Sequence, residues 1–437
     1  MQRIFFIGIK GAGMSALARI LAAQGNIVKG SDIESYVFTE MGLREDGIPI
    51  VPFQTKNFDE QYDIIIKGNA FNKDNNIEVA YLEKCGIEMI PYYTYLQHFL
   101  EKYTSFAVTG THGKTTTTGL IAKLFENDDF AYLIGDGTGF SKKNAHYFVF
   151  ESCEYKRHFL AYHPDYSVIT NIEFDHPDYF KDLDDVIDAF ISMVRQTKKK
   201  VIAFGDDVAV QAVISSTESD KFLTYGFNAG NDYLVKEYNP TADGMSFALY
   251  YHNDFMYQFE LPFYGTHMLL NALAAIIVGH IENKTWEDIE QQLRKYEGVK
   301  RRFNVETVAD YILIDDYAHH PTEIAVTLEA VKQKFPEKQI VAIFQPHTFT
   351  RTTTLADAFI DALEKSDVVY VTDIFASARE TGYDTKPTIL LEKNSTIKHL
   401  TKENIEVLMS HKNSVFVFMG AGDIQKYLES FKKILEK

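Results

Sequence analysis

A glycine-rich loop near position 110 constrains the fold more than any other feature of this sequence. An apolar run at 105–108 is followed by Thr109-Gly-Thr-His-Gly-Lys-Thr-Thr-Thr117, and a helical pattern begins near Thr115. A loop that follows a strand and opens a helix is typical of P-loop domains, whose lysine contacts nucleotide phosphates and whose next threonine ligates Mg²⁺. The usual spacing has glycine where this chain has Val108, so the loop is a variant. The pattern predicts an α/β domain that binds ATP.

Short apolar runs alternate with amphipathic stretches along the chain, which is the pattern of parallel α/β sheets. Three segments open with such a run, at 4–7, 105–108 and 311–314. We therefore expect an α/β protein with a Rossmann-like N-terminal domain, a central P-loop domain with a parallel sheet, and a Rossmann-like C-terminal domain. Strand-like runs on both sides of Asn253-Asp254 predict an additional β-hairpin region in the central domain. The expected domains are 1–103, 104–305 and 306–437.

Charge and cysteine content limit the compartment and the partners. The chain has 44 Lys and Arg against 61 Asp and Glu, a net charge of −17, which argues against binding nucleic acid or an anionic membrane. Cys85 and Cys153 show no zinc-binding spacing, and we expect no disulfide. The uncharged stretch 261–281 contains Pro262 and Gly265, which favours a turn and a buried helix over a membrane span. We expect a cytoplasmic protein.

A second glycine-rich loop lies near the N-terminus, where Gly11-x-Gly13-x-x-Ala16 follows an apolar run. Asp32 follows 19 residues after Gly13, at the end of a second expected strand. This arrangement lets a phosphate approach the amides at the start of a helix, and it matches most of the dinucleotide-binding fingerprint. By itself, the motif is compatible with NAD, with another nucleotide diphosphate, or with a purely structural glycine turn.

Polar residues at two further strand ends are candidates for binding magnesium. One expected strand runs directly into Glu151, and another leads to a segment that contains Glu173, Asp175 and His176. The carboxyl ends of parallel strands converge on the edge that carries a P-loop, so Glu151 and His176 are placed to hold metal beside Thr115. For Glu173 and Asp175, helix capping or a surface position explains the residue equally well.

Four motifs that occur in one order together resemble those of the Mur ligase family, across essentially the whole chain. They are Gly8-Ile-Lys-Gly-Ala-Gly-Met-Ser15, Thr109-Gly-Thr-His-Gly-Lys-Thr-Thr116, Asp315-Asp-Tyr-Ala-His-His-Pro321 and Gln345-Pro-His-Thr-Phe-Thr-Arg351. The resemblance implies that the N-terminal domain holds a UDP-sugar, that the central domain holds ATP, and that the C-terminal domain brings in an amino acid. It also implies that the N-terminal glycine loop binds a UDP diphosphate instead of NAD.

The resemblance further assigns residues of this chain to each function. For the UDP-sugar it implies Gly8, Gly11, Ala12, Gly13, Met14, Ser15, Ser31, Asp32, Asn69 and Ala70. For ATP it implies Gly110, Thr111, His112, Gly113, Lys114, Thr115, Thr116, His267, Asn271, Arg302 and Asp316. For the amino acid and the rest of the substrate it implies Tyr317, His319, His320, His347 and Arg351. The implied catalytic residues are Lys114, Glu151, His176 and Arg302, and the implied ligands of two Mg²⁺ ions are Thr115, Glu151 and His176.

The chain departs from the family pattern at two positions. Met268 stands where the family usually has an adenine-facing asparagine. Thr348 stands where an arginine is common, which leaves Arg351 as the candidate for pairing a substrate carboxylate. Three implied residues also have structural alternatives, namely helix capping for Asn271, a domain-junction salt bridge for Arg302 and core packing for His320.

The implied activity is ATP-dependent ligation of L-alanine to the lactyl carboxylate of UDP-N-acetylmuramate, in peptidoglycan precursor synthesis. An acyl phosphate forms first, and the amine then displaces phosphate, with His319 and His347 as candidates for the base. A close alternative is a recycling ligase that attaches a whole peptide to the same UDP-sugar. An alternative from another class is a nucleotide-regulated, NAD-binding sensor or assembly protein. We expect a monomer or homodimer whose domains close during turnover.

Overall fold

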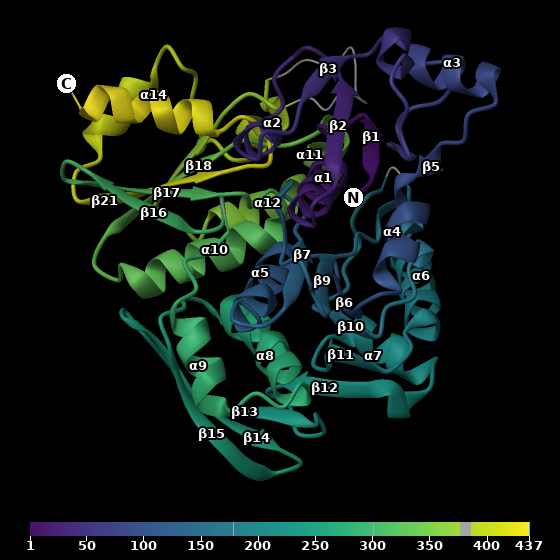
Figure 1. The fold of residues 1–437 in the computed structure, drawn as a ribbon. Coiled ribbons are helices and arrows are strands. Elements are labelled where there is room, and N and C mark those ends of the chain that lie inside the picture. Colours follow the sequence, from purple (N-terminus) through teal and green to yellow (C-terminus); the bar gives the residue numbers. More distant parts are fainter. Residues whose placement is uncertain (178, 300, 376–385, 437) are drawn as a thin grey trace. The chain divides into compact units, whose positions relative to one another are not determined.

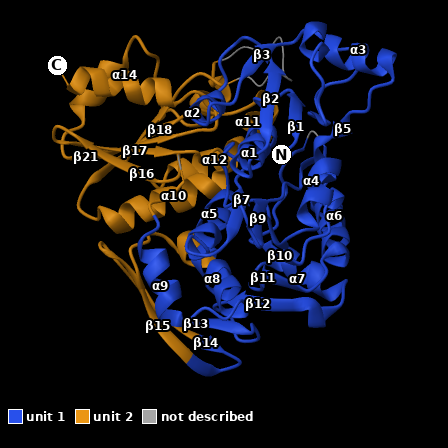
Figure 2. Ribbon diagram, in the orientation of Figure 1, with its two compact units in different colours: residues 1–235, 250–255, 271–296 blue, residues 236–249, 256–270, 297–437 orange. Residues whose placement is uncertain are grey.

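The computed structural model describes residues 1–177, 179–299, 301–375 and 386–436 (Figure 1). The chain separates into two compact units, which Figure 2 shows in different colours. The first unit comprises residues 1–235, 250–255 and 271–296, and the second comprises residues 236–249, 256–270 and 297–437.

The N-terminal domain contains a parallel sheet of five described strands in the order β3-β2-β1-β4-β5, which is the Rossmann order around a central first strand. The sheet is covered on both faces, because Phe6 packs in one hydrophobic cluster with α1 whereas Phe5 packs in another with α3. The strands are β1 (Arg3–Ile7), β2 (Ile27–Asp32), β3 (Ile50–Pro52), β4 (Ile64–Lys67) and β5 (Ile90–Pro91). The helices are α1 (Ala12–Ala23), α2 (Glu40–Glu45), α3 (Ile77–Cys85) and α4 (Tyr92–Leu100).

The central domain is built on a sheet of ten described strands in the order β15-β14-β13-β12-β11-β10-β6-β9-β7-β8. The P-loop strand β6 lies between β9 and β10 and is parallel to both, so the ends of those two strands flank the P-loop. The strands before the hairpin region are β6 (Thr104–Thr109), β7 (Phe130–Leu133), β8 (Gly139–Ser141), β9 (Tyr147–Glu151), β10 (Tyr166–Ile169), β11 (Lys200–Phe204) and β12 (Phe222–Gly226). The helices are α5 (Lys114–Leu124), α6 (Leu183–Gln196), α7 (Val208–Ser215), α8 (Thr266–Ile281) and α9 (Trp286–Arg294).

The expected hairpin is confirmed and is preceded by a strand that the sequence pattern did not predict. Strand β13 (Tyr233–Thr241) pairs in parallel with β12, and β14 (Gly244–Tyr251) and β15 (Asp254–Leu261) follow it. His252 and Asn253 form the turn with φ of 48° and 73°, as the favoured two-residue hairpin turns require. The stretch 261–281 forms a turn and helix α8, and no helix in the described ranges is long and apolar enough to cross a membrane.

The C-terminal domain has a sheet of six described strands in the order β16-β17-β21-β18-β19-β20, parallel except for β16 at one edge. The strands are β16 (Asn304–Val308), β17 (Tyr311–Asp316), β18 (Gln339–Phe344), β19 (Val368–Val371), β20 (Lys398–His399) and β21 (Ser414–Met419). The helices are α10 (Pro321–Lys334), α11 (Phe349–Thr354), α12 (Ala356–Leu363), α13 (Thr388–Lys393) and α14 (Gln425–Leu435). The predicted three-domain α/β fold is confirmed, and the domain boundaries stay predictions.

Candidate active site

The P-loop joins β6 to α5 and has the backbone conformation that its glycines permit. Gly110 and Gly113 have φ of 134° and 80°, which other residues rarely adopt. Asn171, in the segment after β10, holds the loop: its carbonyl accepts from the amide of Thr111 at 3.0 Å, and its Oδ1 accepts from the amide of His112 at 2.9 Å. The loop therefore places the first amides of α5 in the position that binds phosphate in P-loop domains.

Lys114 is the first residue of α5, and its side chain turns back over the loop. Its Nζ donates to the carbonyl oxygens of Gly110 at 2.5 Å and Thr111 at 3.0 Å and to Glu154 Oε1 at 3.3 Å, and it lies 3.0 Å from Glu154 Oε2. Burial lowers the pKa of Lys114, but the surrounding carboxylates, Glu154 first, raise it further, so the net pKa lies above the ordinary value. The ammonium is therefore charged and committed to these three acceptors.

Thr115 and Glu151, two of the expected magnesium ligands, are in contact. Thr115 Oγ1 donates to Glu151 Oε2 at 2.9 Å, and the amide of Gly135 donates to the same oxygen at 2.9 Å. The neighbouring strands β6 and β9 bring them together, because Glu151 ends β9 and Thr115 follows the loop that leaves β6. A hydroxyl and a carboxylate are oxygen ligands of the kind that Mg²⁺ prefers, so this pair fits one Mg²⁺ ion.

His176 lies in the segment after β10 with φ of 56°, a left-handed conformation that is costly for a residue with a side chain. Its Nε2 is 3.7 Å from Glu154 Oε1 and 3.8 Å from Asp175 Oδ2. Its ring centroid is 4.5 Å from that of Tyr155. These neighbours place His176 beside the P-loop lysine's carboxylate partner, and its function as a metal ligand stays a prediction.

Glu154 belongs to this site although the prediction from the sequence assigned it no function. It follows Glu151 by three residues, and its side chain is only 3% exposed while it contacts both Lys114 and His176. The signal in the sequence was a second glutamate shortly after a strand that ends beside a P-loop. That signal does not show which of the two glutamates faces the lysine and which faces the threonine.

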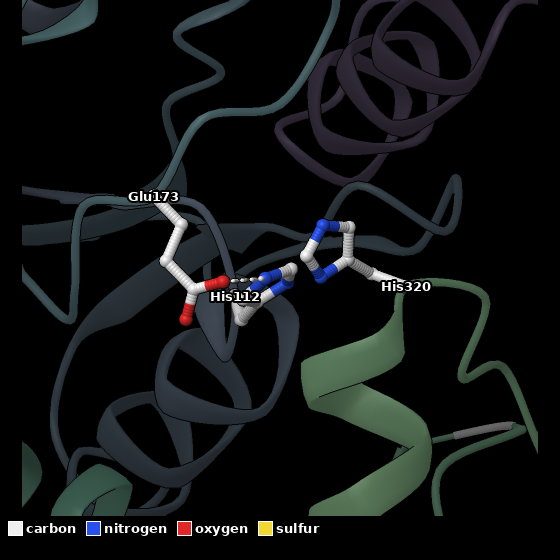
Figure 3. Close-up of side chains that lie close together, drawn as sticks. All are labelled: His112, Glu173 and His320. Atoms are coloured by element: carbon white, nitrogen blue, oxygen red, sulfur yellow. Dashed lines mark ion pairs between the residues drawn. The ribbon is translucent and has the colours of Figure 1, made fainter. Parts of the chain in front are cut away.

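His112 and Glu173 form another polar pair beside the P-loop (Figure 3). His112 Nε2 and Glu173 Oε2 are 3.5 Å apart, and the amide of Glu173 donates to Thr111 Oγ1 at 2.8 Å. Asp175 instead accepts from the amide of the next residue, His176, at 2.7 Å. The third side chain drawn in Figure 3, His320, belongs to the second unit.

Asn271 and Thr116 also lie next to the P-loop within the first unit. A Cβ atom on Gly113 would be 2.5 Å from Asn271 Oδ1. Asn271 is in the second turn of α8, so the alternative of helix capping is excluded by its place in the helix. Thr116 is buried in the first turn of α5.

The N-terminal glycine loop joins β1 to α1 and packs closely against aromatic rings. Gly8 has φ of 83°, and a Cβ atom there would lie 2.2 Å from the Phe71 ring. A Cβ atom on Gly13 would lie 2.5 Å from the hydroxyl of Tyr92. Gly11 is the N-cap of α1, so the helix begins at its successor, Ala12. The amides of this first turn form a site suited to a phosphate group. The first turn includes the candidates Ala12, Met14 and Ser15.

Two other N-terminal candidates have structural partners. Asp32, at the end of β2, accepts from the backbone amides of Lys10 at 2.6 Å and Ile33 at 2.8 Å, so it orders the glycine loop. The hydroxyl of Ser31 donates to the buried carboxylate of Glu78. The exposed segment after β4 carries the remaining candidates, Asn69 and Ala70.

In the second unit, Arg302, Asp316 and Tyr317 lie together. The guanidinium carbon of Arg302 is 5.1 Å from the centroid of the Tyr317 ring, and its Nη1 is 3.6 Å from Glu323 Oε1. Asp316 accepts from two backbone amides, at 2.7 and 2.8 Å. Burial raises the pKa of Asp316 to about 6, and the nearby charge of Arg302 opposes that rise.

The Ala-His-His-Pro motif forms the start of α10. His320 is the N-cap, and the Glu323 carboxylate accepts from the backbone amides of His319 at 3.0 Å and His320 at 3.3 Å. His319 Nδ1 is 3.1 Å from the same carboxylate. His320 is therefore a buried residue at the N-cap of α10, and its function in substrate binding stays a prediction.

The second motif of this unit lies at the start of α11. The ring of His347 stacks on Phe375 with centroids 5.8 Å apart, and it lies 6.0 Å from the ring of His319. Arg351 is buried in α11. Thr348, the position of the second family departure, has φ of 66°, which is strained for a β-branched residue.

His267 lies in the first turn of α8 and is partly buried. Burial lowers its pKa to about 4, so the imidazole is neutral near pH 7. Within the part of the chain that the structure describes, its Nδ1 has no hydrogen-bond partner. A neutral ring nitrogen of this kind suits a hydrogen bond to a nucleobase, as the resemblance implied.

Three family models match the chain in order. The model described as "Mur ligase family, catalytic domain" matches residues 3–104, "Mur ligase middle domain" matches 108–279, and "Mur ligase, glutamate ligase domain" matches 301–422. The matched segments include all four motifs and therefore every group of site residues described above.

Full-length relatives agree with these matches. A UDP-N-acetylmuramate–L-alanine ligase of Streptococcus thermophilus is 47% identical over 433 residues, which cover 98% of this chain and 96% of that protein. The crystal structure of a UDP-N-acetylmuramate–alanine ligase from Thermotoga maritima has a TM-score of 0.82 and 28% identity, with 100% of this chain and 99% of that chain covered. A murein peptide ligase from Psychrobacter arcticus shares the fold, with a TM-score of 0.71, 22% identity and coverage of 100% and 99%.

Proposed function

Because the chain belongs to the Mur ligase family, we propose that it uses ATP to join L-alanine to the lactyl carboxylate of UDP-N-acetylmuramate. The observation that carries the proposal is the P-loop site, in which Lys114 covers the loop and Thr115 meets Glu151 at 2.9 Å. The identity of 47% to alanine ligases supports L-alanine as the amino acid. The product is a peptidoglycan precursor. The test below, which compares L-alanine with a tripeptide as the acceptor, distinguishes this function from that of a recycling ligase.

The first step forms an acyl phosphate. The lactyl carboxylate attacks the γ-phosphorus of ATP, and the bond from that phosphorus to the ADP oxygen breaks. Lys114 neutralises charge on the phosphate oxygens, and Arg302 is proposed to do so at the terminal phosphate. Thr115 and Glu151 would hold one Mg²⁺ ion and His176 a second, and bound Mg²⁺ neutralises charge on the same oxygens. Removing one such cationic contact typically lowers the rate by about 10²–10³.

The second step forms the amide bond. The alanine amine attacks the acyl carbon, phosphate leaves, and the amine gives up a proton. His319 and His347 are the candidate bases, because histidine is the side chain that most often accepts a proton in catalysis. Their ring centroids lie 6.0 Å apart within one unit. Arg351 and Tyr317 are proposed to bind the carboxylate and the rest of the substrate.

The test measures phosphate release with ATP and UDP-N-acetylmuramate against a panel of amino acids. We expect release to depend on L-alanine and not on a tripeptide acceptor. Release with the tripeptide but not with alanine would identify a recycling ligase. Binding of NADH without binding of the UDP-sugar would instead support the sensor or assembly alternative.

A variant of the P-loop lysine tests the ATP site directly. We expect Lys114→Ala to abolish ADP release while calorimetry still detects binding of UDP-N-acetylmuramate, because the glycine loop of the N-terminal domain is untouched. Lys123→Ala is the matched control, since Lys123 lies in the last turn of the same helix and pairs with Glu126 at 2.6 Å. Turnover retained by Lys114→Ala would overturn the assignment of ATP to this loop.

We also propose a cytoplasmic protein, because the nucleotide-linked substrate and ATP are both found there and both cysteines are free. The proposed oligomeric state is a monomer or homodimer, which light scattering on the purified protein will distinguish.

A further inference from the structure

The P-loop lysine has its full hydrogen-bonding capacity engaged by the protein. An ammonium group has three protons to donate. Lys114 Nζ donates to three acceptors: the carbonyl oxygens of Gly110 at 2.5 Å and Thr111 at 3.0 Å, and Glu154 Oε1 at 3.3 Å. A nucleotide phosphate therefore gains a hydrogen bond from this lysine only when one of these acceptors gives it up.

Glu154 is the acceptor that a phosphate is best suited to replace. The two carbonyls belong to the loop itself, which Asn171 holds by hydrogen bonds to its amides. Glu154 supplies the negative charge of the set, and a phosphate supplies the same charge. A carboxylate left beside a bound phosphate would repel it. A site in which the phosphate has replaced the Glu154 carboxylate at Lys114 therefore has a lower energy than a site that holds both anions there.

The carboxylate of Glu154 is almost fully buried. Its side chain is 3% exposed, and its backbone carbonyl accepts from the amide of Arg157 at 2.8 Å. Arg157 has φ of 57°, and its guanidinium is bound to Asp185 at 2.5 Å, so the turn that follows Glu154 is held in an unusual conformation. Glu154 must therefore find another partner within the site.

His176 is placed to be that partner. Its Nε2 is 3.7 Å from Glu154 Oε1, which is the same carboxylate oxygen that accepts from Lys114. The ring of Tyr155 lies against the imidazole at 4.5 Å and restricts its movement. A small rotation of the glutamate would exchange its contact with Lys114 for a hydrogen bond from His176.

We propose that Glu154 is the resident counter-ion of Lys114, that nucleotide phosphates must displace it, and that its carboxylate then turns to His176. This inference rests on the proposed ATP site. Glu154 thereby weakens the binding of nucleotides, because Lys114 must give up its ion pair with Glu154 before it can bind a phosphate. Glu154 does not change the affinity for a nucleoside, which has no phosphate. It is a positioning residue for the nucleotide and sets how strongly the P-loop holds ATP.

The experiment measures the affinity of ATP and of adenosine by calorimetry in EDTA, for the wild type and for Glu154→Gln. We expect the variant to bind ATP about tenfold more tightly, which corresponds to about 1.4 kcal/mol, and to bind adenosine with unchanged affinity. Glutamine keeps the size of the side chain but removes the charge that competes for Lys114. Unchanged adenosine affinity would show that the fold of the site is intact.

Glu173→Gln is the matched control, because it removes the same charge beside the same loop from a residue that pairs with His112 at 3.5 Å and not with Lys114. We expect it to change ATP affinity less than about twofold. An equal gain in both variants would overturn the inference in favour of general charge repulsion. Unchanged or weaker ATP binding by Glu154→Gln would also overturn it.

A second variant covers the case in which Glu154→Gln does not fold. Glu154→Asp keeps the charge but shortens the side chain, so we expect a smaller gain in ATP affinity than the glutamine variant would give. An unchanged or lower affinity in that variant would contradict the inference. If the wild type itself binds no ATP, the proposed function has failed, and this result is distinct from the outcomes above.

Discussion

Burial determines the protonation of Asp316. Its side chain is almost fully buried and accepts two backbone hydrogen bonds, at 2.7 and 2.8 Å. Loss of solvation outweighs these bonds and the charge of Arg302, and it raises the pKa from 3.8 to about 6. The folded protein therefore holds this proton at pH values where the unfolded chain has lost it.

We expect this difference to appear in the dependence of stability on pH. A raised folded-state pKa contributes stability that is fully present below pH 3.8 and is lost as the pH rises through about 6, a change of about 3 kcal/mol. Between about pH 4 and pH 6.5, the unfolding temperature of the wild type should fall relative to that of Asp316→Asn, as measured by calorimetry.

The control for this comparison is Asp361→Asn, which changes an exposed aspartate of α12. Its unfolding temperature should follow that of the wild type across the same pH range. Parallel curves for the wild type and Asp316→Asn would contradict the assignment of the raised pKa to Asp316.

At the scale of elements, the β7–β8 hairpin connects the two sites of the first unit. Gly135 donates its amide to Glu151, and a Cβ atom on Gly137 would lie 2.6 Å from Thr39 Cγ2 and 3.0 Å from Ser15 Oγ. A Cβ atom on Gly139 would lie 2.1 Å from the carbonyl oxygen of Ala16 in α1. The hairpin thus contacts the candidate metal ligand on one side and the glycine-loop helix on the other.

This packing predicts that Gly139→Ala strongly destabilises the first unit, because the added methyl group meets the backbone of α1 and not a flexible side chain. We expect a loss of about 3 kcal/mol or failure to fold, as overpacking against backbone implies. Chemical denaturation followed by tryptophan fluorescence and circular dichroism measures the loss.

Gly25→Ala provides the comparison for this prediction. Gly25 has φ of 89°, but a Cβ atom there meets nothing within 4 Å, so the change costs only backbone strain of about 1–2 kcal/mol. Equal losses for the two variants would show that the contact between β8 and α1 contributes little.

At the scale of the whole molecule, the net charge of −17 opposes the approach of both phosphate-bearing substrates. The charges near the P-loop do not reverse this repulsion. Lys114 is paired with Glu154, and two further carboxylates, those of Glu151 and Glu173, lie beside the loop. The attraction for phosphate is therefore confined to short distances, at helix N-termini and individual cations.

We therefore expect the association rate of ATP to rise with ionic strength. Salt screens long-range repulsion, so the rate measured by stopped flow should increase by about two- to threefold between about 0.02 and 0.3 M salt. Uncharged adenosine should show no such dependence. A rate that falls with salt would indicate a steering positive field that the charges described here do not provide.

The sequence alone was sufficient for the architecture and for the location of the nucleotide loops. The apolar runs before Gly8, Gly110 and Asp315 are local signals, and the order of the four motifs indicated the Mur ligase family, which the domain matches confirm. Strand β13 was missed because it has no strict alternation of apolar and polar residues: its burial runs from three buried residues to an exposed end.

The partners of the site residues required the tertiary structure. Glu151 and Glu154 are three residues apart, and nothing in their spacing says that the first faces Thr115 and the second faces Lys114. Ser31 and Asp32 likewise form hydrogen bonds with Glu78 and with the amide of Lys10, which are 47 and 22 residues away.

The sequence by itself determined where the glycine loops lie, because apolar runs mark the strands before them and glycine permits backbone conformations that other residues rarely adopt. It also determined the family and the order of the three α/β domains. Only the tertiary structure decided which charges meet and how far each is buried, as at Lys114, Glu154 and Asp316. The physical reason is that pairing and desolvation depend on distances between segments that are far apart in the chain, and local residue patterns do not encode those distances.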